Sequence, residues 1–195
     1  MTSTRTYDMR SRDASAQTTR ERIVGAACEL FLAQWYDDVT LTAIAERAGV
    51  SGQTVLNHFG GKEPLFAAAV DRMRDEVRER RSRATPGDAD AALAALLADY
   101  EVTGDSVIRL LAVEERIPAA QPVLAGGRAT HREWLQTMFG VVTPELLVAT
   151  DVYTWKLLRR DQGLDAAAVA QVMRRLVDAA LAAPPAHHDP AGSPA

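Results

Sequence analysis

The segment Thr40–Phe59 constrains the fold of this chain more than any other stretch, because it holds two short helical patterns separated by a glycine. Thr40 can cap the first helix through its hydroxyl. Gly49 permits the left-handed backbone that a tight helix-to-helix turn needs. Ser51 can cap the second helix, and Ala45 is small where two steeply crossing helices touch. We therefore expect a helix-turn-helix.

The second of these helices, over residues 52–58, presents small and polar side chains on the side that faces away from the core. Such a surface on a short protruding helix fits the major groove of DNA. Gln53 and Asn57 can each form paired hydrogen bonds with adenine, and Leu56 can contact a thymine methyl group. The pattern therefore predicts a recognition helix.

Lys62 follows almost immediately, at the start of a third predicted helix. A cation beside the free backbone N–H groups of a helix N-terminus suits a phosphate. This context supports DNA binding, because a bare helix-turn-helix pattern also occurs by chance in helical proteins.

The stretch from about Arg20 to Phe66 resembles the DNA-binding region of the TetR family of bacterial transcriptional regulators. The resemblance lies in the motif Ile-Ala-Glu-Arg-Ala-Gly-Val-Ser, in Thr54–Phe59 and in Gly61–Glu63. It implies an all-α, nine-helix architecture with an N-terminal three-helix DNA-binding domain and a C-terminal helical domain for ligand binding and dimerisation. The size of the chain agrees with that family.

The resemblance also implies roles for individual residues, with phosphate contacts from Thr40, Thr54 and Lys62. The expected DNA-binding residues are Thr40, Ser51, Gly52, Gln53, Thr54, Leu56, Asn57, His58 and Lys62. The family usually has an aromatic residue where Leu56 stands and often Lys where Gly52 stands, so weaker backbone contact is implied at both positions. A histidine at a helix end is more often packed or phosphate-facing than a base reader, and both roles stay open for His58.

The whole chain shows nine helical segments and no convincing strand between two polar ends. We expect a flexible arm over 1–17, the DNA-binding domain over 18–62, the ligand-binding and dimerisation domain over 63–183, and a disordered tail over 184–195. Among the rear helices, Gly104 is expected to end one helix before Asp105 caps the next. The sequence Thr143-Pro144-Glu145 predicts the start of a helix that runs to about residue 161.

Large side chains in the rear domain are candidates for an effector site, although ordinary core packing explains them equally well. In the resembling family such residues surround a small-molecule cavity, and a cavity between helices is a common ligand site. The candidates are Tyr100, Arg109, Trp134, Met138 and Trp155.

Two helices near the C-terminal end carry more apolar surface than one contact needs, so a second copy of the chain is the expected cover. A fully internal helix is the alternative. The predicted dimer-interface residues are Val152, Leu158, Val169, Met173, Leu176 and Val177. A two-fold dimer would present two recognition helices to a near-palindromic site.

Composition excludes several other classes of protein. The single cysteine, Cys28, cannot form an internal disulfide and is expected to be a buried core residue. No stretch approaches the length of a membrane span, and the N-terminus does not resemble a secretory signal, so we expect a soluble, cytoplasmic protein. Neither a cofactor nor a metal is expected, and the pair His187 and His188 lacks further ligands nearby.

The sequence therefore favours a repressor that binds operator DNA as a homodimer and is released by a small-molecule effector. A helical enzyme is disfavoured, because no nucleophile–base pair or Gly-rich phosphate loop is present and Glu114 and Glu115 point about 100° apart on a helix. The remaining alternative is a helical adaptor that binds only protein.

Overall fold

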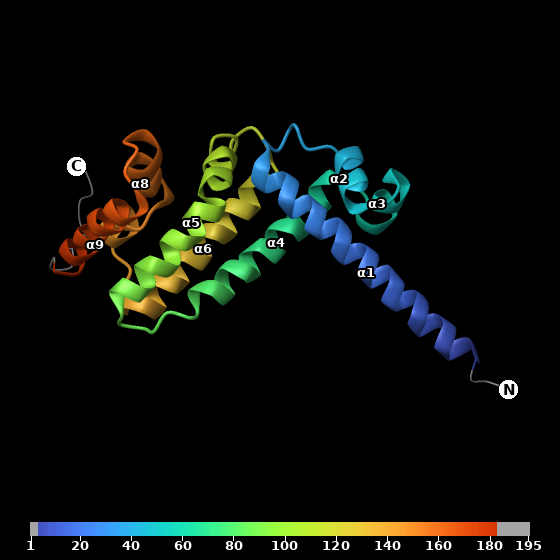
Figure 1. Cartoon of the computed structure of the whole chain (residues 1–195), viewed down its shortest axis with the longest axis horizontal. Helices are drawn as coiled ribbons and strands as arrows, with labels where there is room; N and C mark the ends of the chain where they lie inside the picture. Colours follow the sequence, from blue (N-terminus) through green and yellow to red (C-terminus); the bar gives the residue numbers. More distant parts are fainter. Residues whose placement is uncertain (1–3, 183–195) are drawn as a thin grey trace, which may run out of the picture. The chain divides into compact units, whose positions relative to one another are not determined.

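The structure is a computed structural model that describes residues 4–182, with side chains from residue 14 onward. Within these residues every regular element is helical, which confirms the expected all-α class. The α-helices (Figure 1) are α1 (Thr4–Ala33), α2 (Leu41–Ala48), α3 (Gly52–Phe59), α4 (Lys62–Arg81), α5 (Ala89–Leu111), α6 (Ala120–Phe139), α7 (Pro144–Ala149), α8 (Val152–Lys156) and α9 (Ala166–Ala182). A π-helical turn, η1 (Leu157–Asp161), continues α8.

The helices pack into two compact units. Unit 1 comprises the described residues up to Arg80 together with Thr103–Ala129, and unit 2 comprises Arg81–Val102 and the described residues from Thr130 onward. The functional boundaries expected at residues 17, 62 and 183 stay predictions. The expected tail over 184–195, with His187 and His188, lies outside the described residues.

The core of unit 1 forms where the apolar stripe of α1 meets α2, α3 and the first half of α4. Phe31, Tyr36 and Phe66 make an aromatic group at its edge, with ring centroids 4.8 Å to 5.8 Å apart. Cys28 is buried as expected, and its thiol donates to the carbonyl of Ala69 at 3.4 Å. Burial raises the pKa of Cys28 to about 11, so this thiol stays protonated at neutral pH.

The first helix begins at Thr4, whereas the sequence predicted a flexible arm before a start near Thr18. Residues 4–17 contain neither Gly nor Pro, and adding residues to an existing helix avoids the cost of a new nucleus. The exposed Gln17 also donates to Glu21, one turn further on, at 3.0 Å. The prediction relied on apolar periodicity, which residues added to the end of an existing helix do not need.

The helices after residue 89 also differ from the expected division. Gly104 is buried within α5, which continues to Leu111, so Asp105 does not begin a new helix. The segment expected as one helix over 144–161 is instead interrupted at Thr150, and Asp151 caps α8 by accepting from the amide of Tyr153 at 2.7 Å. Two segments predicted as separate helices thus form the single helix α5, and one predicted helix is divided into α7 and α8. The described residues are nevertheless all-helical, as predicted.

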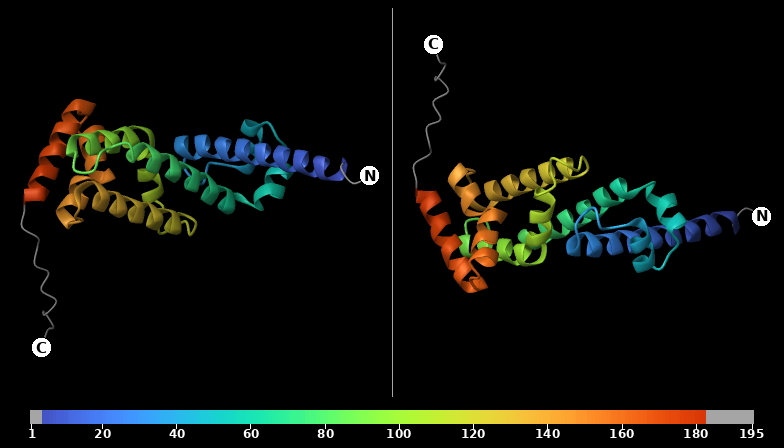
Figure 2. Two further views of the ribbon diagram at one scale, coloured as in Figure 1. Left: turned by 90° about the horizontal axis from the view of Figure 1, so that it is seen from below. Right: turned by 90° about the horizontal axis from the view of Figure 1, so that it is seen from above.

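The remaining helix starts follow the sequence signals. Thr143 accepts from the amide of Leu146 at 3.1 Å, directly before the proline of α7. Asp88 caps α5 by accepting from the amide of Ala91 at 2.9 Å. In unit 2, both views in Figure 2 place α9, drawn in red, against the orange helices that precede it in the sequence, in agreement with the packing of α7 on α9.

Unit 2 has an ion pair in its interior between Arg81 and Asp99, with a separation of 2.5 Å between the guanidinium and the carboxylate. The Asp99 side chain is fully buried, and the guanidinium of Arg81 lies 5.3 Å from the ring centre of Trp134 and 5.8 Å from that of Tyr100. Charges removed from water in this way must remain paired, because an unpaired buried ion is costly.

None of the helices within residues 4–182 is both long and apolar enough to cross a membrane. The same part of the chain contains no cluster of three or more side chains suited to hold a metal ion.

We predict that Asp99→Ala lowers the free energy of unfolding by about 3–5 kcal/mol, because it leaves Arg81 buried without its carboxylate partner. Glu29→Ala is the matched control, since it breaks the exposed pair between Glu29 and Arg47 and is expected to cost less than about 1 kcal/mol. Urea denaturation of both variants measures the difference. Equal losses would contradict a structural role for the buried pair.

Candidate nucleic-acid interface

The helix-turn-helix begins with a cap at Thr40. The Thr40 hydroxyl oxygen accepts from the amide of Ala43 at 3.1 Å, which ends the preceding loop and starts α2. Ile44, Ala45 and Ala48 are buried on the inner face of this helix. The exposed side of α2 is tied to α1 by the guanidinium of Arg47, which donates to Glu29 at 2.7 Å.

The turn between α2 and α3 depends on Gly49. Its φ of 64° and ψ of 41° are left-handed, a conformation that costs other residues about 1–2 kcal/mol. The amide of Val50 donates to the carbonyl of Ala45 at 2.9 Å, and the guanidinium of Arg22 donates to the carbonyls of Ala48 and Gly49. A Cβ atom on Gly49 would lie 2.9 Å from Nη2 of Arg22 and would displace this flexible guanidinium, so it is the left-handed backbone that favours glycine here.

The orientation of α3 is fixed at both of its ends. Ser51 caps the helix, with its hydroxyl oxygen accepting from the amide of Thr54 at 3.1 Å, and the two hydroxyl groups lie 2.8 Å apart. Val55 and Phe59 are buried in the core of unit 1, and the guanidinium of Arg20 lies 4.3 Å from the centre of the Phe59 ring. The opposite side of α3 must therefore face solvent.

The solvent side of α3 carries the residues that the sequence predicted there. Gly52, Gln53, Leu56 and Asn57 are exposed, and the amide nitrogen of Gln53 donates to the amide oxygen of Asn57 at 2.9 Å. His58 is half-buried beside Phe59. Two neighbouring amides on a protruding helix can offer both donors and acceptors to base edges, although their role as DNA contacts stays a prediction.

Lys62 is the first residue of α4 and lies against the loop that joins α1 to α2. Its ammonium donates to the backbone carbonyl of Asp37 at 3.4 Å and lies 4.3 Å from the centre of the Tyr36 ring. Partial burial lowers the pKa of Lys62, and the nearby carboxylates of Asp37 and Asp38 act in the opposite direction. The sequence identified Lys62 but not this support, because the loop residues show no periodic pattern.

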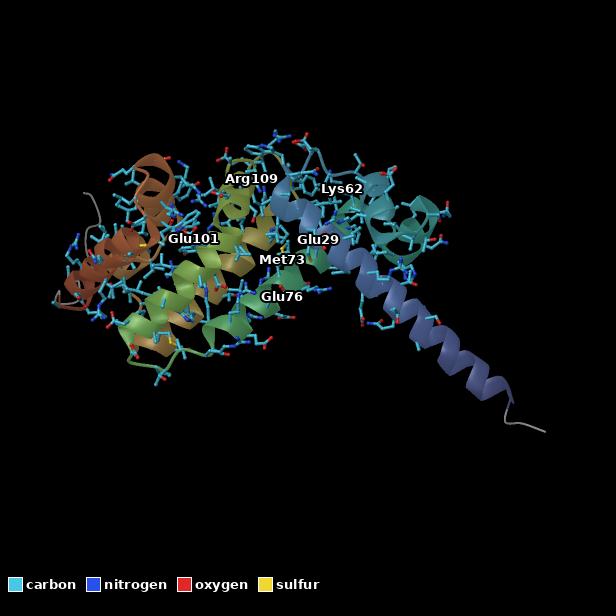
Figure 3. The ribbon with its side chains drawn as sticks, viewed as in Figure 1. Glu29, Lys62, Met73, Glu76, Glu101 and Arg109 are labelled. Atoms are coloured by element: carbon cyan, nitrogen blue, oxygen red, sulfur yellow. The ribbon has the colours of Figure 1, made fainter. Side chains whose placement is uncertain are left out.

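Two arginines from the C-terminal part of α5 and the following turn reach the end of α1 and the same loop. Arg109 donates to the carbonyl of Leu32, and Arg116 forms an exposed ion pair with Asp37. The hydrogen bond from Arg116 holds the pKa of Asp37 below its usual value. Figure 3 labels Arg109 and Lys62, which both lie near the C-terminal end of α1.

Arg109 and the other candidates for the effector site fall in different units, and their common role stays a prediction. Arg109 belongs to unit 1, whereas Tyr100, Trp134, Met138 and Trp155 are buried in unit 2. Within unit 2 the Tyr100 hydroxyl donates to the carbonyl of Thr150 at 2.8 Å, and the Tyr100 and Trp155 rings lie 5.9 Å apart.

A polar group surrounds the ring of Trp134. The ring of His131 stacks on it at 5.7 Å, and burial lowers the pKa of His131 to about 4, so the imidazole is neutral at physiological pH. The Thr150 hydroxyl donates to the carbonyl of Leu146, so Nε2 of His131 donates to the Thr150 oxygen at 3.0 Å. The buried indole nitrogen of Trp134 has no hydrogen-bond partner among the described residues.

The predicted dimer interface needs a correction. Most of its residues are already buried by this chain itself, and only Leu176, with 42% of its surface accessible, is exposed. The buried residues are Val152, Leu158, Val169, Met173 and Val177. Helical periodicity identified the apolar stripe of α9 correctly, but it could not tell that α7 and α8 of the same unit cover that stripe.

Other apolar residues of unit 2 remain exposed. The exposed large apolar side chains of its last helices are Val148, Tyr153, Leu157, Leu176 and Leu181. Val148 and Leu176 line a groove between α7 and α9, together with Pro144, Glu145, Ala149, Ala179 and Ala180. We call this region the α7/α9 groove.

Comparison with known proteins agrees with this geometry. The profile described as bacterial regulatory proteins, tetR family, matches residues 23–69. The chain is 46% identical over 57 residues to the HTH-type transcriptional regulator SrpR of Pseudomonas putida, which covers 29% of this chain and 27% of SrpR. It is 39% identical over 93 residues to the HTH-type transcriptional regulatory protein RaaS of Mycobacterium tuberculosis, which covers 48% of this chain and 42% of RaaS.

The chain thus spans about a quarter to two fifths of the length of these curated relatives. A crystal structure of a tetR-family transcriptional regulator from Streptomyces coelicolor superposes with a TM-score of 0.67, at 20% identity, over 85% of this chain and 80% of that one. At this identity the likeness concerns the fold, and it extends the agreement well beyond the helix-turn-helix.

We predict that Gly49→Ala lowers the free energy of unfolding by at least about 1–2 kcal/mol, because alanine disfavours the left-handed turn and displaces Arg22. Gly52→Ala is the matched control, since a Cβ atom there meets no atom within 4 Å, and it is expected to be neutral or slightly stabilising. Chemical denaturation followed by circular dichroism compares the two. A Gly49→Ala protein as stable as Gly52→Ala would refute the requirement for glycine in the turn.

Proposed function

We propose that this chain, a TetR-family protein by its N-terminal domain and its helical fold, is a transcriptional repressor that binds a near-palindromic operator as a homodimer and is released by a small-molecule effector. The observation that carries the proposal is the exposed amide pair of Gln53 and Asn57 on α3, a helix whose opposite side is anchored by buried Val55 and Phe59. Its site of action is the cytoplasm, where bacterial DNA lies.

Base recognition is assigned to the exposed side of α3. Gln and Asn side chains can each donate to N7 and accept from N6 of adenine, and the mutual hydrogen bond of Gln53 and Asn57 keeps both amides on one side of the helix. Leu56, which is 42% exposed on the same helix, supplies an apolar contact for a thymine methyl group. Gly52 leaves room for the DNA backbone at the start of the helix.

Phosphate contacts are assigned to the starts of three helices. Thr40 uses its oxygen as an acceptor for the cap of α2, so its hydroxyl hydrogen remains a donor for a phosphate. Ser51 and Thr54 occupy the first turn of α3, and Lys62 begins α4. Helix N-termini and a cation favour the same anionic partner.

Effector binding is assigned to the interior of unit 2, around Tyr100, Trp134, Met138 and Trp155. The charges there are already paired through Arg81 and Asp99, and His131 is neutral at physiological pH. The indole N–H of Trp134 is a buried donor without a partner among the described residues, which favours a ligand that brings an acceptor atom. Release from DNA requires that the effector bind the two states of the repressor with different affinities.

Dimerisation is assigned to the α7/α9 groove, with Leu176 at its exposed apolar lining. An exposed groove lined mostly by apolar side chains, here with Val148 and Leu176, is typical of association surfaces. A two-fold contact through this region would use the same residues on both copies, and it would carry two α3 helices to the two halves of one operator.

We predict that Gln53→Ala and Asn57→Ala each weaken binding to the operator by about 10- to 100-fold, because each removes an amide that pairs with a base. Weak binding to unrelated DNA at low salt should persist, because it depends on phosphate contacts. Gln121→Ala, at an exposed position of α6, is the matched control. Gel shifts with the intergenic DNA that flanks the gene measure these affinities.

Two results would count against this assignment. Unchanged operator affinity of both α3 variants would remove base recognition from this helix. A wild-type protein that binds no duplex at low salt would favour a helical adaptor that contacts only protein.

We predict that Leu176→Glu raises the dissociation constant of the dimer at least about tenfold, because a carboxylate would be buried in an apolar contact. Gln171→Glu, exposed on the same helix but outside the α7/α9 groove, adds the same charge as the control. Analytical ultracentrifugation gives the masses. A Leu176→Glu protein that stays dimeric, or a monomeric wild type, would refute this interface.

A further inference from the structure

Two residues of the loop that joins α1 to α2, residues 34–40, pack into the core of unit 1. Tyr36 packs in the aromatic group with Phe31 and Phe66, and Val39 is completely buried. Asp37 lies between these two anchors and is itself exposed. The anchors fix where the loop lies, but they leave the orientation of residue 37 to other contacts.

Arg116 supplies such a contact from the turn that follows α5. Its guanidinium donates to the carboxylate of Asp37, and this hydrogen bond raises the pKa of Arg116 and lowers the pKa of Asp37. Both groups are therefore charged at neutral pH. A planar guanidinium that holds a carboxylate gives a directional contact as well as an attraction.

The backbone carbonyl of the same residue receives the ammonium of Lys62. This hydrogen bond is 3.4 Å long, and the Tyr36 ring beneath the ammonium gives a second contact at 4.3 Å. One of the three ammonium donors is used by this carbonyl, so the others are available for an anion. Two different groups of Asp37 thus connect Arg116 on one side with Lys62 on the other.

We propose that Arg116 and Asp37 are positioning residues that hold Lys62 where the DNA backbone passes. This inference rests on the proposed function, because it assigns Lys62 to a phosphate contact. Arg116 lies in the turn after α5 and acts only through residue 37.

A purely electrostatic role can be separated from positioning by the sign of its effect. Removing the negative charge of Asp37 would by itself strengthen the attraction to DNA, because the carboxylate lies close to Lys62. A positioning role predicts weaker DNA binding instead. Without the Arg116 contact, residue 37 is free to turn, and its carbonyl moves away from Lys62. Asp37→Asn therefore gives opposite results under the two explanations.

The test compares operator affinity and its salt dependence in charge-matched variants. Arg116→Gln should weaken binding about two- to fivefold, the range that one exposed ion pair can supply, and should reduce the salt slope by up to about one. Arg128→Gln is the control: it removes the same charge and breaks an exposed ion pair with Glu114, which lies in the same turn as Arg116. Arg116→Lys should retain most of the affinity, and Asp37→Asn should weaken binding.

Lys62→Gln removes the proposed phosphate contact completely and serves as the background for a double variant. Adding Arg116→Gln to Lys62→Gln should cause no further loss, because both changes remove the same contact. The inference is overturned if Arg116→Gln behaves like Arg128→Gln, if Asp37→Asn tightens binding, or if the two losses add. A loss of affinity with an unchanged salt slope and a lower melting temperature would likewise overturn it, since that pattern indicates general destabilisation.

A measurement without DNA separates this inference from the proposed function. The ε-methylene protons of Lys62 lie near the face of the Tyr36 ring and should resonate upfield in the NMR spectrum. Arg116→Gln should move them toward the value of a solvated lysine, whereas Arg128→Gln should not. An unchanged shift in Arg116→Gln overturns the positioning role, and a wild type that keeps the shift but binds no DNA overturns only the proposed function.

Discussion

The left-handed turn at Gly49 is the constraint on which the candidate interface depends. Neither α2 nor α3 is long enough to be stable alone, because each has only eight residues. Their stability comes from caps at Thr40 and Ser51 and from apolar residues buried in unit 1. The turn determines that both helices can be buried on one side at once, and Arg22 holds its carbonyls from α1. The exposed side of α3 is thus a consequence of how its other side is fixed.

Ion pairs serve different purposes in the two units. In unit 1 the pair of Arg116 with Asp37 is exposed, so it adds little to the free energy of unfolding. Its proposed role is to orient residue 37. In unit 2 the pair of Arg81 with Asp99 lies in the interior, beside aromatic rings and a neutral histidine. There it removes net charge from the region assigned to the effector. A buried indole N–H without a partner among the described residues, at Trp134, favours an effector with an acceptor atom.

The accuracy of sequence reasoning differed between these regions for a physical reason. Caps and turns depend on neighbours within a few residues, so Ser51, Gly49 and the start of α7 could be identified from the sequence. Helix ends were predicted less well, since Gly104 continues α5 in a buried environment and residues 4–17 extend α1 without any apolar stripe. The apolar stripe of α9 was recognised, but the surface that covers it was assigned to a second copy, whereas α7 and α8 of the same chain bury most of it.

The sequence alone determined that this chain is all-helical, that it carries a helix-turn-helix, and which side of α3 faces outward, because those properties follow from local propensity and periodicity. Only the tertiary structure decided which contacts join residues far apart in the chain. It brought Arg22 to the turn at Gly49, Arg116 to Asp37, and Lys62 to the carbonyl and ring that support it. Long side chains and loop carbonyls make such contacts across 25 residues or more of sequence, and no periodic pattern records them because each depends on where the backbone places two separate segments.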